Sequence, residues 1–350
     1  MISKTPPRVS IVLPVRDAAP WLAECLDSVL AQTEENFELI AVDDGSRDAS
    51  LSILKACAGR DARLRLLGTG SRGGDIVAAL NLALEAARAP ILVRMDADDR
   101  MHPERVARQA DALDADRSLF AVASRATAFP AEQLQDGMRA YLEWQNGLLT
   151  PEDIARDRFI ESPVLHPSVA MRTGVVRGIL GGWRPASWPE DWDFFLRAFE
   201  HGFRIARLPE VLLEWRLHPG QLTRTHARYS EQALLDARAT YLARRLDGVV
   251  PSGRPIWILG AGPVGKGLVK ALATRGIVAA GLADVDPRKI GGVVRGAAHR
   301  WAVVQHARLQ RMTPRPFAVS AVSGAEARVR VRGLLATWSW KEGEDFVVAA

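Results

Sequence analysis

The stretch that decides the fold is ILVRMDADD, at residues 91–99. Its first part, Ile91–Met95, is a short apolar run typical of a buried strand, and the run ends in Asp96, Asp98 and Asp99. Similar runs lie earlier in the chain, at Val9–Pro14, Phe37–Val42 and Leu64–Leu67. Segments with helical apolar spacing separate these runs. Strands that alternate with helices predict an α/β fold, with a mostly parallel sheet and helices on both faces.

Charged residues follow two of the other predicted strands as well. Arg16 and Asp17 come after the first strand, and Asp43 and Asp44 end the second. The carboxyl ends of parallel strands meet at one edge of a sheet, which is where such folds bind ligands. So many carboxylates would repel one another unless a cation or hydrogen-bond donors were present. This edge therefore predicts a polar ligand and a divalent metal, Mg²⁺ or Mn²⁺, which prefer carboxylate oxygens.

The pattern changes after Arg100. A helix is expected over Pro103–Leu113, and short strands are expected at Phe120–Ala123, Ile205–Leu208 and Val211–Arg216. Glu190 and Asp191 open another predicted helix. Acidic residues at a helix N-terminus have an ordinary structural explanation, because they complement the helix dipole.

The last hundred residues begin a second α/β pattern. After a linker-like stretch, a predicted strand at Ile256–Leu259 leads into a turn with Gly260, Gly262 and Gly265. A further strand, expected at Ile277–Leu282, is followed by Asp284. Glycines in such a turn let the backbone approach a pyrophosphate, and the acidic residue can bind a ribose. This small Rossmann-like unit is a candidate second nucleotide site; the alternative is a unit that packs on its neighbour and binds nothing.

The composition narrows the classes of protein to which the chain can belong. The 350 residues are 48% hydrophobic and 25% charged, which suits a folded two-domain protein. We find no apolar run long enough to span a membrane, no secretory signal and no nucleic-acid-binding signature, so we expect a cytoplasmic protein without a nucleic-acid partner. Residues 251–350 hold 15 Lys and Arg against 6 Asp and Glu, a net charge of +9. That excess allows peripheral docking at an anionic inner membrane face.

Five segments together resemble the family 2 glycosyltransferases of GT-A fold. In chain order they are VSIVLPVR (9–16), VDDGSRD (42–48), GGDIVAALN (73–81), RMDADDRMHPER (94–105) and WPEDWDFFLR (188–197). The resemblance covers roughly residues 8–226. It implies a GT-A domain at residues 1–228, followed by a helix and linker at 229–254 and a small Rossmann-like domain at 255–350, which resembles modules that precede sugar acyltransferase domains.

The resemblance also implies roles for particular residues. Pro14 and Arg16 would line the nucleotide base of a UDP- or GDP-sugar, and Asp44 or Asp43 would hydrogen-bond it. The residues that would bind the nucleotide sugar and the metal lie in the aspartate motif and in the segment RLH at 216–218. They are Asp96, Asp98, Asp99, Arg216 and His218. Asp191 would be the catalytic base, with Glu190 orienting it or binding the acceptor. Asp17 departs from the family pattern, because asparagine is common at its position.

The chemistry of sugar transfer agrees with these residue types. A metal neutralises the nucleoside diphosphate as it leaves, and a carboxylate takes the proton of the acceptor hydroxyl. One base opposite the leaving group predicts a single displacement with inversion, onto a hydroxyl of a glycan, a lipid-linked acceptor or a protein. Three alternatives stay open: an NAD(P)-dependent oxidoreductase or nucleotide-binding regulatory protein built on the Gly260–Gly265 turn, a sugar- or nucleotide-binding protein without turnover, and a nucleotidyltransferase that releases pyrophosphate.

Overall fold

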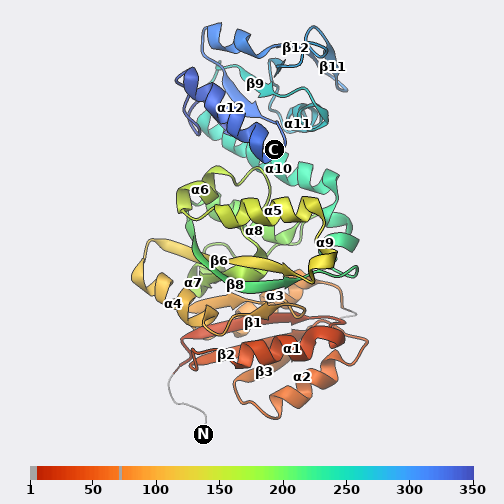
Figure 1. Ribbon diagram of the computed structural model, residues 1–350, viewed down its shortest axis with the longest axis vertical. Coiled ribbons are helices and arrows are strands. Elements are labelled where there is room, and N and C mark those ends of the chain that lie inside the picture. Colours follow the sequence, from red (N-terminus) through yellow and green to blue (C-terminus); the bar gives the residue numbers. More distant parts are fainter. Residues whose placement is uncertain (1–5, 71–72) are drawn as a thin grey trace. The chain divides into compact units, whose positions relative to one another are not determined.

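The computed structural model describes residues 6–70 and 73–350 (Figure 1). The chain forms two compact units. The first takes in the chain up to Ala155, together with Val164–Ala186 and Asp193–Thr225. The second combines His226–Ala350 with two short segments, Arg156–Pro163 and Ser187–Trp192.

An eight-stranded sheet forms the centre of the first unit, in the order β3-β2-β1-β4-β7-β6-β8-β5. Neighbouring strands from β3 to β4 run parallel, whereas β7 is antiparallel to both β4 and β6. The strands are β1 (Val9–Val15), β2 (Phe37–Asp43), β3 (Leu64–Gly68), β4 (Ile91–Arg94), β5 (Arg100–Met101), β6 (Leu119–Phe129), β7 (Val169–Arg172) and β8 (Arg204–Arg216). The chain extends the sheet from β1 toward β3 and then returns to place β4 on the other side of β1. A topological switch point therefore lies between β1 and β4.

Helices cover both faces of this sheet, as the alternating pattern predicts. On β1, Ile11 and Leu13 belong to a core cluster that includes Leu22 and Leu26 of one helix, α1. Val12 belongs instead to the cluster that contains Leu80 of another helix, α3. The helices and short 3₁₀ turns are α1 (Ala19–Leu30), α2 (Ser50–Ala58), α3 (Ile76–Ala86), α4 (Arg105–Ala115), η1 (Ala131–Gln133), α5 (Asp136–Gly147), α6 (Pro151–Arg156), η2 (His166–Ser168), α7 (Thr173–Gly178), α8 (Glu190–Glu200) and α9 (Leu222–Thr225).

The first four predicted strands form within a residue or two of their expected limits, but three later predictions were wrong. The short strand expected at Phe120–Ala123 is the 11-residue strand β6. The two strands expected between residues 205 and 216 are one strand, β8. It stays continuous because it absorbs the extra residues as irregular register against β6. The strand expected at Ile277–Leu282 begins only at Gly281, because residues 277–280 form an irregular connection in place of sheet pairing.

The second unit has a six-stranded sheet in the order β11-β12-β10-β9-β13-β14. Its strands are parallel except for the edge strand β11. The elements are η3 (Ala227–Tyr229), α10 (Glu231–Val249), β9 (Ile256–Leu259), α11 (Pro263–Ala273), β10 (Gly281–Asp284), β11 (Val293–Arg295), β12 (Arg300–Gln305), η4 (His306–Arg311), β13 (Phe317–Ser320), α12 (Ala325–Thr337) and β14 (Phe346–Val348). The predicted domain limits stay a prediction. Among the described residues, no helix is both long and apolar enough to cross a bilayer.

One titratable group, His166, lies inside the core of the first unit. Its Nε2 accepts a hydrogen bond of 3.0 Å from Nε1–H of Trp183, and its ring contacts the edge of Phe195. Burial, with a smaller contribution from the charge of Arg94, lowers the pKa of His166 well below its ordinary value. The imidazole is therefore neutral in the folded chain, and protonation would also remove the hydrogen bond from Trp183.

This buried histidine predicts a pH-dependent stability. Below about pH 6.5 the unfolded chain takes up a proton that the folded chain excludes. The free energy of unfolding therefore decreases as the pH is lowered, by up to about 1.4 kcal/mol per pH unit from this group. Chemical denaturation at pH 7.5 and pH 5.5 measures the slope. His166→Gln should flatten it, whereas His201→Gln, at an exposed position, should not. Equal slopes for the wild type and His166→Gln would contradict the prediction.

Candidate functional site

Three parallel strands end at the same edge of the first unit's sheet and bring the predicted charged residues together. Val15 of β1 lies opposite Asp43 of β2, and Val12 of β1 lies opposite Arg94 at the end of β4. Pro14 is partly exposed on β1 and Arg16 follows it at the surface. The edge therefore brings the residues expected to line the base together with the aspartates at the switch point between β1 and β4.

Asp96, Asp98 and Asp99 form a compact cluster after β4. Each offers a carboxylate oxygen, and these oxygens all lie within 4.8 Å of one another. Asp99 is completely buried, and burial, followed by the charges of Asp98 and Asp96, raises its pKa well above the ordinary value. The cluster thus offers several oxygen ligands for a metal, and the aspartates repel one another when they are ionised.

Two buried arginines lie beneath the cluster and compensate part of that charge. Arg94 forms an ion pair with Asp96. Arg105, at the start of α4, donates to the carbonyl of Arg94 at 2.9 Å. Burial lowers the pKa of Arg105 to about 9, so it is still a cation at neutral pH.

The chain after β8 completes the cluster. Strand β5 follows Asp99 directly and pairs with β8, which carries Arg216 to the aspartates. The backbone N–H of Arg216 donates to Asp99 Oδ1 at 2.8 Å, and its Nε donates to the carbonyl of Asp98 at 2.6 Å. His218 Nε2 lies 2.9 Å from Asp98 Oδ2, and its ring lies 3.9 Å from the ring of Trp21, measured between centroids.

These residues fit a hard divalent cation. The donor set is carboxylate oxygen with one imidazole nitrogen, which suits Mg²⁺ or Mn²⁺. Within the described part of the chain, the buried Oδ2 of Asp99 has no hydrogen-bond partner. An unsatisfied buried carboxylate oxygen is costly, and a cation would supply the missing partner.

Asp43 and Asp44 are adjacent but differ in what they contact. The Asp44 carboxylate accepts hydrogen bonds from Thr69 Oγ1 at 3.0 Å and from the backbone N–H groups of Gly74 and Asp75 at 2.7 and 2.8 Å. It holds the loop that precedes α3. Among the described residues, the buried Oδ1 of Asp43 has no such partner. Asp43, unlike Asp44, therefore keeps a carboxylate oxygen whose hydrogen-bonding capacity the described residues do not use.

The loop at Gly73 and Gly74 needs glycine for two reasons. Both residues have positive φ angles, +79° and +97°. A Cβ on Gly74 would lie 2.2 Å from Nη1 of Arg16, and a Cβ on Gly73 would lie 2.2 Å from the carbonyl oxygen of Asp44. The absence of side chains here lets Arg16 lie across the loop, within 4.0 Å of Asp44 Oδ2.

Glu190 and Asp191 begin α8 and belong to the second unit. Glu190 is buried and forms an ion pair of 2.9 Å with Arg228, while the hydroxyl of Tyr229 lies 3.3 Å from its Oε1. Asp191 is partly exposed, and its Oδ1 accepts from the backbone N–H of Trp192 at 2.8 Å. The two neighbours thus have different environments: Glu190 is engaged by the fold, and Asp191 caps the start of the helix.

Sequence reasoning missed four residues around the aspartate cluster. They are Arg94, Arg105, Trp21 and Cys25, whose Sγ donates to the carbonyl of Asp96 at 3.2 Å. Arg94 and Arg105 stand inside the RMDADDRMHPER segment, so a search for cations near the carboxylates could have found them. The sequence pattern predicts only ordinary core positions of α1 for Trp21 and Cys25, so no signal could have identified them.

Comparison with known proteins identifies the family. Residues 10–179 match the family model described as Glycosyl transferase family 2. The chain is 30% identical over 227 residues to the glycosyltransferase EpsE of Bacillus subtilis, covering 64% of this chain and 78% of EpsE. It is 28% identical over 221 residues to an uncharacterized glycosyltransferase of Haemophilus influenzae, covering 61% of this chain and 67% of that protein.

A solved structure shares the fold. S. aureus TarS 1–349, in complex with UDP-GlcNAc, superimposes with a TM-score of 0.55 at 17% sequence identity, over 69% of this chain and 67% of TarS. With the EpsE and family-model matches, this shows that the chain belongs to the family 2 glycosyltransferases, has the GT-A fold and is an enzyme.

Proposed function

We propose that this chain is an inverting, metal-dependent glycosyltransferase that moves a sugar from a UDP- or GDP-type donor to a hydroxyl acceptor. The observation that carries the proposal is the aspartate cluster at the switch point of a parallel sheet, with the buried Asp99 Oδ2 unsatisfied among the described residues. Such an edge is where open α/β sheets bind ligands. A cation and a diphosphate together would satisfy both the geometry and the charge.

The donor's nucleotide would lie over the ends of β1 and β2. We assign the base to Pro14, Arg16 and Asp43, because the Asp43 carboxylate has the open acceptor, and we give Asp44 the task of holding the loop at 73–75. TarS, which was solved with UDP-GlcNAc, supports a nucleoside-diphosphate sugar as the donor class. Asp96, which is paired with Arg94, would accept from the ribose hydroxyls.

Asp98, Asp99 and His218 would hold the divalent cation. When bound, Mn²⁺ or Mg²⁺ neutralises the charge that develops on the leaving diphosphate. In this proposal Arg216 positions the aspartates. Its backbone N–H donates to the Asp99 carboxylate and its Nε donates to the carbonyl of Asp98. The Nη2 of Arg216 pairs with Glu24, so both ends of its guanidinium are anchored.

We assign Asp191 as the general base. The acceptor oxygen forms a bond to the anomeric carbon, and the bond from that carbon to the diphosphate oxygen breaks with its electron pair on the diphosphate. The acceptor's proton passes to the Asp191 carboxylate. A single displacement of this kind inverts the anomeric centre. Glu190 is a positioning residue in this scheme, because its ion pair with Arg228 fixes the first turn of α8.

The acceptor class stays a proposal: a hydroxyl on a glycan, a lipid-linked sugar or a protein. Membrane contact is likewise proposed, from the net charge of +9 in residues 251–350. Flotation with anionic liposomes tests it, since an electrostatic contact should be lost at high salt.

Replacing the proposed base should abolish turnover while donor binding persists. Asp191→Asn should lower kcat by about 10²–10⁴-fold, which is the usual contribution of a general base, with little change in donor affinity. The assay is release of nucleoside diphosphate from UDP-N-acetylglucosamine, UDP-glucose and GDP-mannose. Glu200→Gln, at the other end of α8, makes the same charge change and should leave kcat within about twofold.

Two results would contradict this assignment. Asp191→Asn with near-wild-type kcat would exclude the carboxylate as base. Release of pyrophosphate in place of nucleoside diphosphate would indicate nucleotidyl transfer. With an active donor, NMR of the product's anomeric proton reports whether the configuration has inverted.

Removing metal should remove donor binding. We expect UDP or GDP to bind in the presence of Mn²⁺ and to bind at least about tenfold more weakly in EDTA. Asp98→Asn should reproduce the EDTA result in the presence of Mn²⁺. Asp136→Asn, an exposed residue at the start of α5, provides the control. Calorimetry that finds equal affinity with and without the metal would overturn the metal assignment.

The Arg16 loop gives a further prediction, with a glycine pair as its internal control. Gly70→Ala and Gly74→Ala both place a side chain at positive φ, +64° and +97°, which costs about 1–2 kcal/mol of stability. Only at Gly74 does the new Cβ collide with Arg16, whereas at Gly70 no atom of the described residues lies within 4 Å of it. Gly74→Ala should therefore weaken UDP or GDP binding more than Gly70→Ala does. Equal affinities in the two variants would show that Arg16 does not contact the nucleotide.

A further inference from the structure

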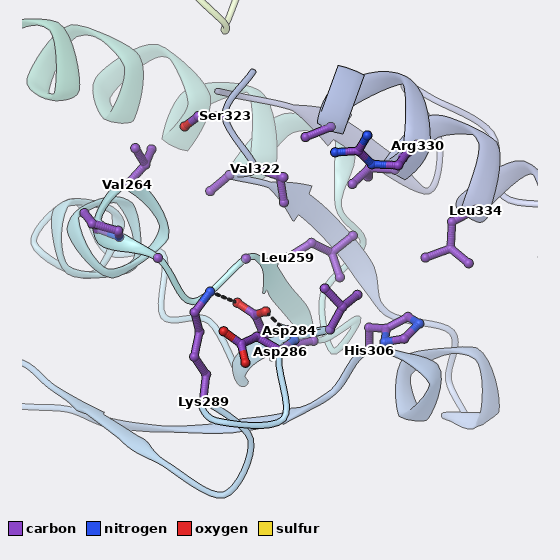
Figure 2. A pocket seen from close by; sticks show the side chains of 18 residues that line it. Leu259, Val264, Asp284, Asp286, Lys289, His306, Val322, Ser323, Arg330 and Leu334 are labelled. Atoms are coloured by element: carbon purple, nitrogen blue, oxygen red, sulfur yellow. Dashed lines mark hydrogen bonds and ion pairs between the residues drawn. The ribbon is translucent and has the colours of Figure 1, made fainter. Parts of the chain in front are cut away.

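The second unit contains a cavity that the transferase reaction does not use. Its volume is about 560 Å³, within the usual range for small-molecule and cofactor sites. Figure 2 shows the glycine-rich turn and Val264 on one side, Asp284, Asp286 and Lys289 below, and His306, Arg330 and Leu334 on the opposite side.

The cavity lies at the switch point of the second sheet. β9 is at the centre, with β10 on one side and β13 on the other. The cavity walls include Leu259 at the end of β9, Asp284 at the end of β10 and Ala321 just after β13. Crevices at the carboxyl ends of strands, where the strand order reverses, are the general ligand sites of open α/β sheets.

The three glycines of the turn have different reasons to be glycine. A Cβ on Gly265 would lie 1.9 Å from the carbonyl oxygen of Gly260, so the packing of α11 requires that glycine. Gly260 has a φ of +99°, and its Cβ would lie 3.0 Å from Val322. Gly262 is different, because its φ is −78° and a Cβ there would meet no atom of the described residues within 4 Å. The fold does not need glycine at position 262, but a ligand that approaches the backbone would.

Gly262 is also the N-cap of α11, and it lines the cavity. No side chain caps this helix, and Pro263 at its first position has no N–H to satisfy. The first-turn N–H groups and the positive end of the helix dipole therefore meet the cavity wall without a protein cap. That combination favours an anion, and phosphate above all.

Asp284 is already engaged by the protein. Its carboxylate accepts from the N–H of Ala261 at 2.7 Å, from the N–H of Asp286 at 2.9 Å and from Lys289 Nζ at 3.0 Å. Burial alone would raise the pKa of Asp284, but these donors hold it below its ordinary value. Asp284 thus joins the end of β10 to the glycine turn, as a positioning residue.

Asp286 is the carboxylate better suited to a ribose. It lines the cavity, and its carboxylate accepts from the backbone N–H of Arg288 at 3.0 Å and from the Arg288 guanidinium at 3.0 and 2.9 Å. The Arg288 side chain is 87% exposed, so ribose hydroxyls can take the place of its guanidinium while the backbone N–H stays bound. Farther along the cavity, the side chains of Val285, Val322 and Leu334 are apolar, and the buried Nδ1 of His306 has no hydrogen-bond partner in the described chain.

We propose that this cavity is a nucleotide-binding site separate from the donor site. The phosphate would bind at the Gly262 turn, the ribose hydroxyls at Asp286, and the base among Val285, Val322 and Leu334 near His306. Because Lys289 already balances Asp284, and Arg288 balances Asp286, this site has no surplus of carboxylates to bring together. Nucleotide binding here should therefore need no divalent metal.

The test uses the full chain carrying Asp98→Asn, which disables the proposed donor site, in buffer with EDTA. ADP, UDP, GDP, NAD⁺ and inorganic pyrophosphate are titrated by calorimetry. We expect at least one nucleotide to bind, and to bind more tightly than pyrophosphate. Adding Gly262→Ala should weaken that affinity by about tenfold or more, while Gly248→Ala, at a glycine with equally open space near the end of α10, should not.

Several outcomes would overturn the proposal. These are absence of binding by every nucleotide at millimolar concentration, binding of pyrophosphate as tight as that of any nucleotide, and an affinity that Gly262→Ala leaves unchanged. Thermal melting identifies a variant that is simply unfolded, in which case Asp286→Asn replaces it and should weaken nucleotides but not pyrophosphate. The experiment does not depend on the proposed transferase mechanism, because it is carried out without metal and with the donor site disabled.

Discussion

The constraint on which the first unit depends is the repulsion among the carboxylates at the end of β4. Three aspartates within 4.8 Å would not stay together without compensation. Arg94 and Arg105 supply it from beneath, and Arg216 and His218 supply it from the chain after β8. The two-residue strand β5, which follows Asp99 directly, pairs with β8 and so brings the end of β8 next to Asp99. Among the described residues, the buried Oδ2 of Asp99 keeps no hydrogen-bond partner, so a cation would bind there and would in turn attract an anionic diphosphate.

Many residues of the recognised motifs hold loops and need not contact a ligand. Asn81 accepts from the N–H of Trp183 at 2.9 Å and donates to its carbonyl at 2.8 Å. Arg197 donates to the carbonyls of Leu180 and Gly182 and pairs with Asp193 at 2.9 Å. The turn at 181–183 is thus fixed from two helices. Residues of a family motif can therefore maintain the backbone conformation around a site as well as take part in its chemistry.

Local sequence could predict the parallel part of the fold, because β1 to β4 are short apolar runs and three of them end in or beside charged residues. It could also predict that Arg16, Asp43, Asp44 and the aspartates after β4 lie at one edge, since strand ends of one parallel sheet must share an edge. Arg216 and His218 are expected only from the family resemblance. Local sequence could not separate Asp43 from Asp44. That difference depends on the backbone N–H groups of Gly74 and Asp75, which only the folded loop brings to Asp44. The same holds for Glu190 and Asp191, since the partner of Glu190 is Arg228, 38 residues away.

The two sheets share one arrangement. In each, a central parallel strand lies beside a switch point, and glycines stand in a nearby loop, Gly73 and Gly74 in the first sheet and Gly260 and Gly262 in the second. At the first edge, the buried Asp99 Oδ2 has no hydrogen-bond partner among the described residues, and under the proposed function a metal would supply one. At the second, Lys289 has already neutralised Asp284, and the helix dipole of α11 meets the cavity uncapped. A diphosphate would therefore require a metal ion at the first edge, whereas backbone N–H groups alone could hold it at the second.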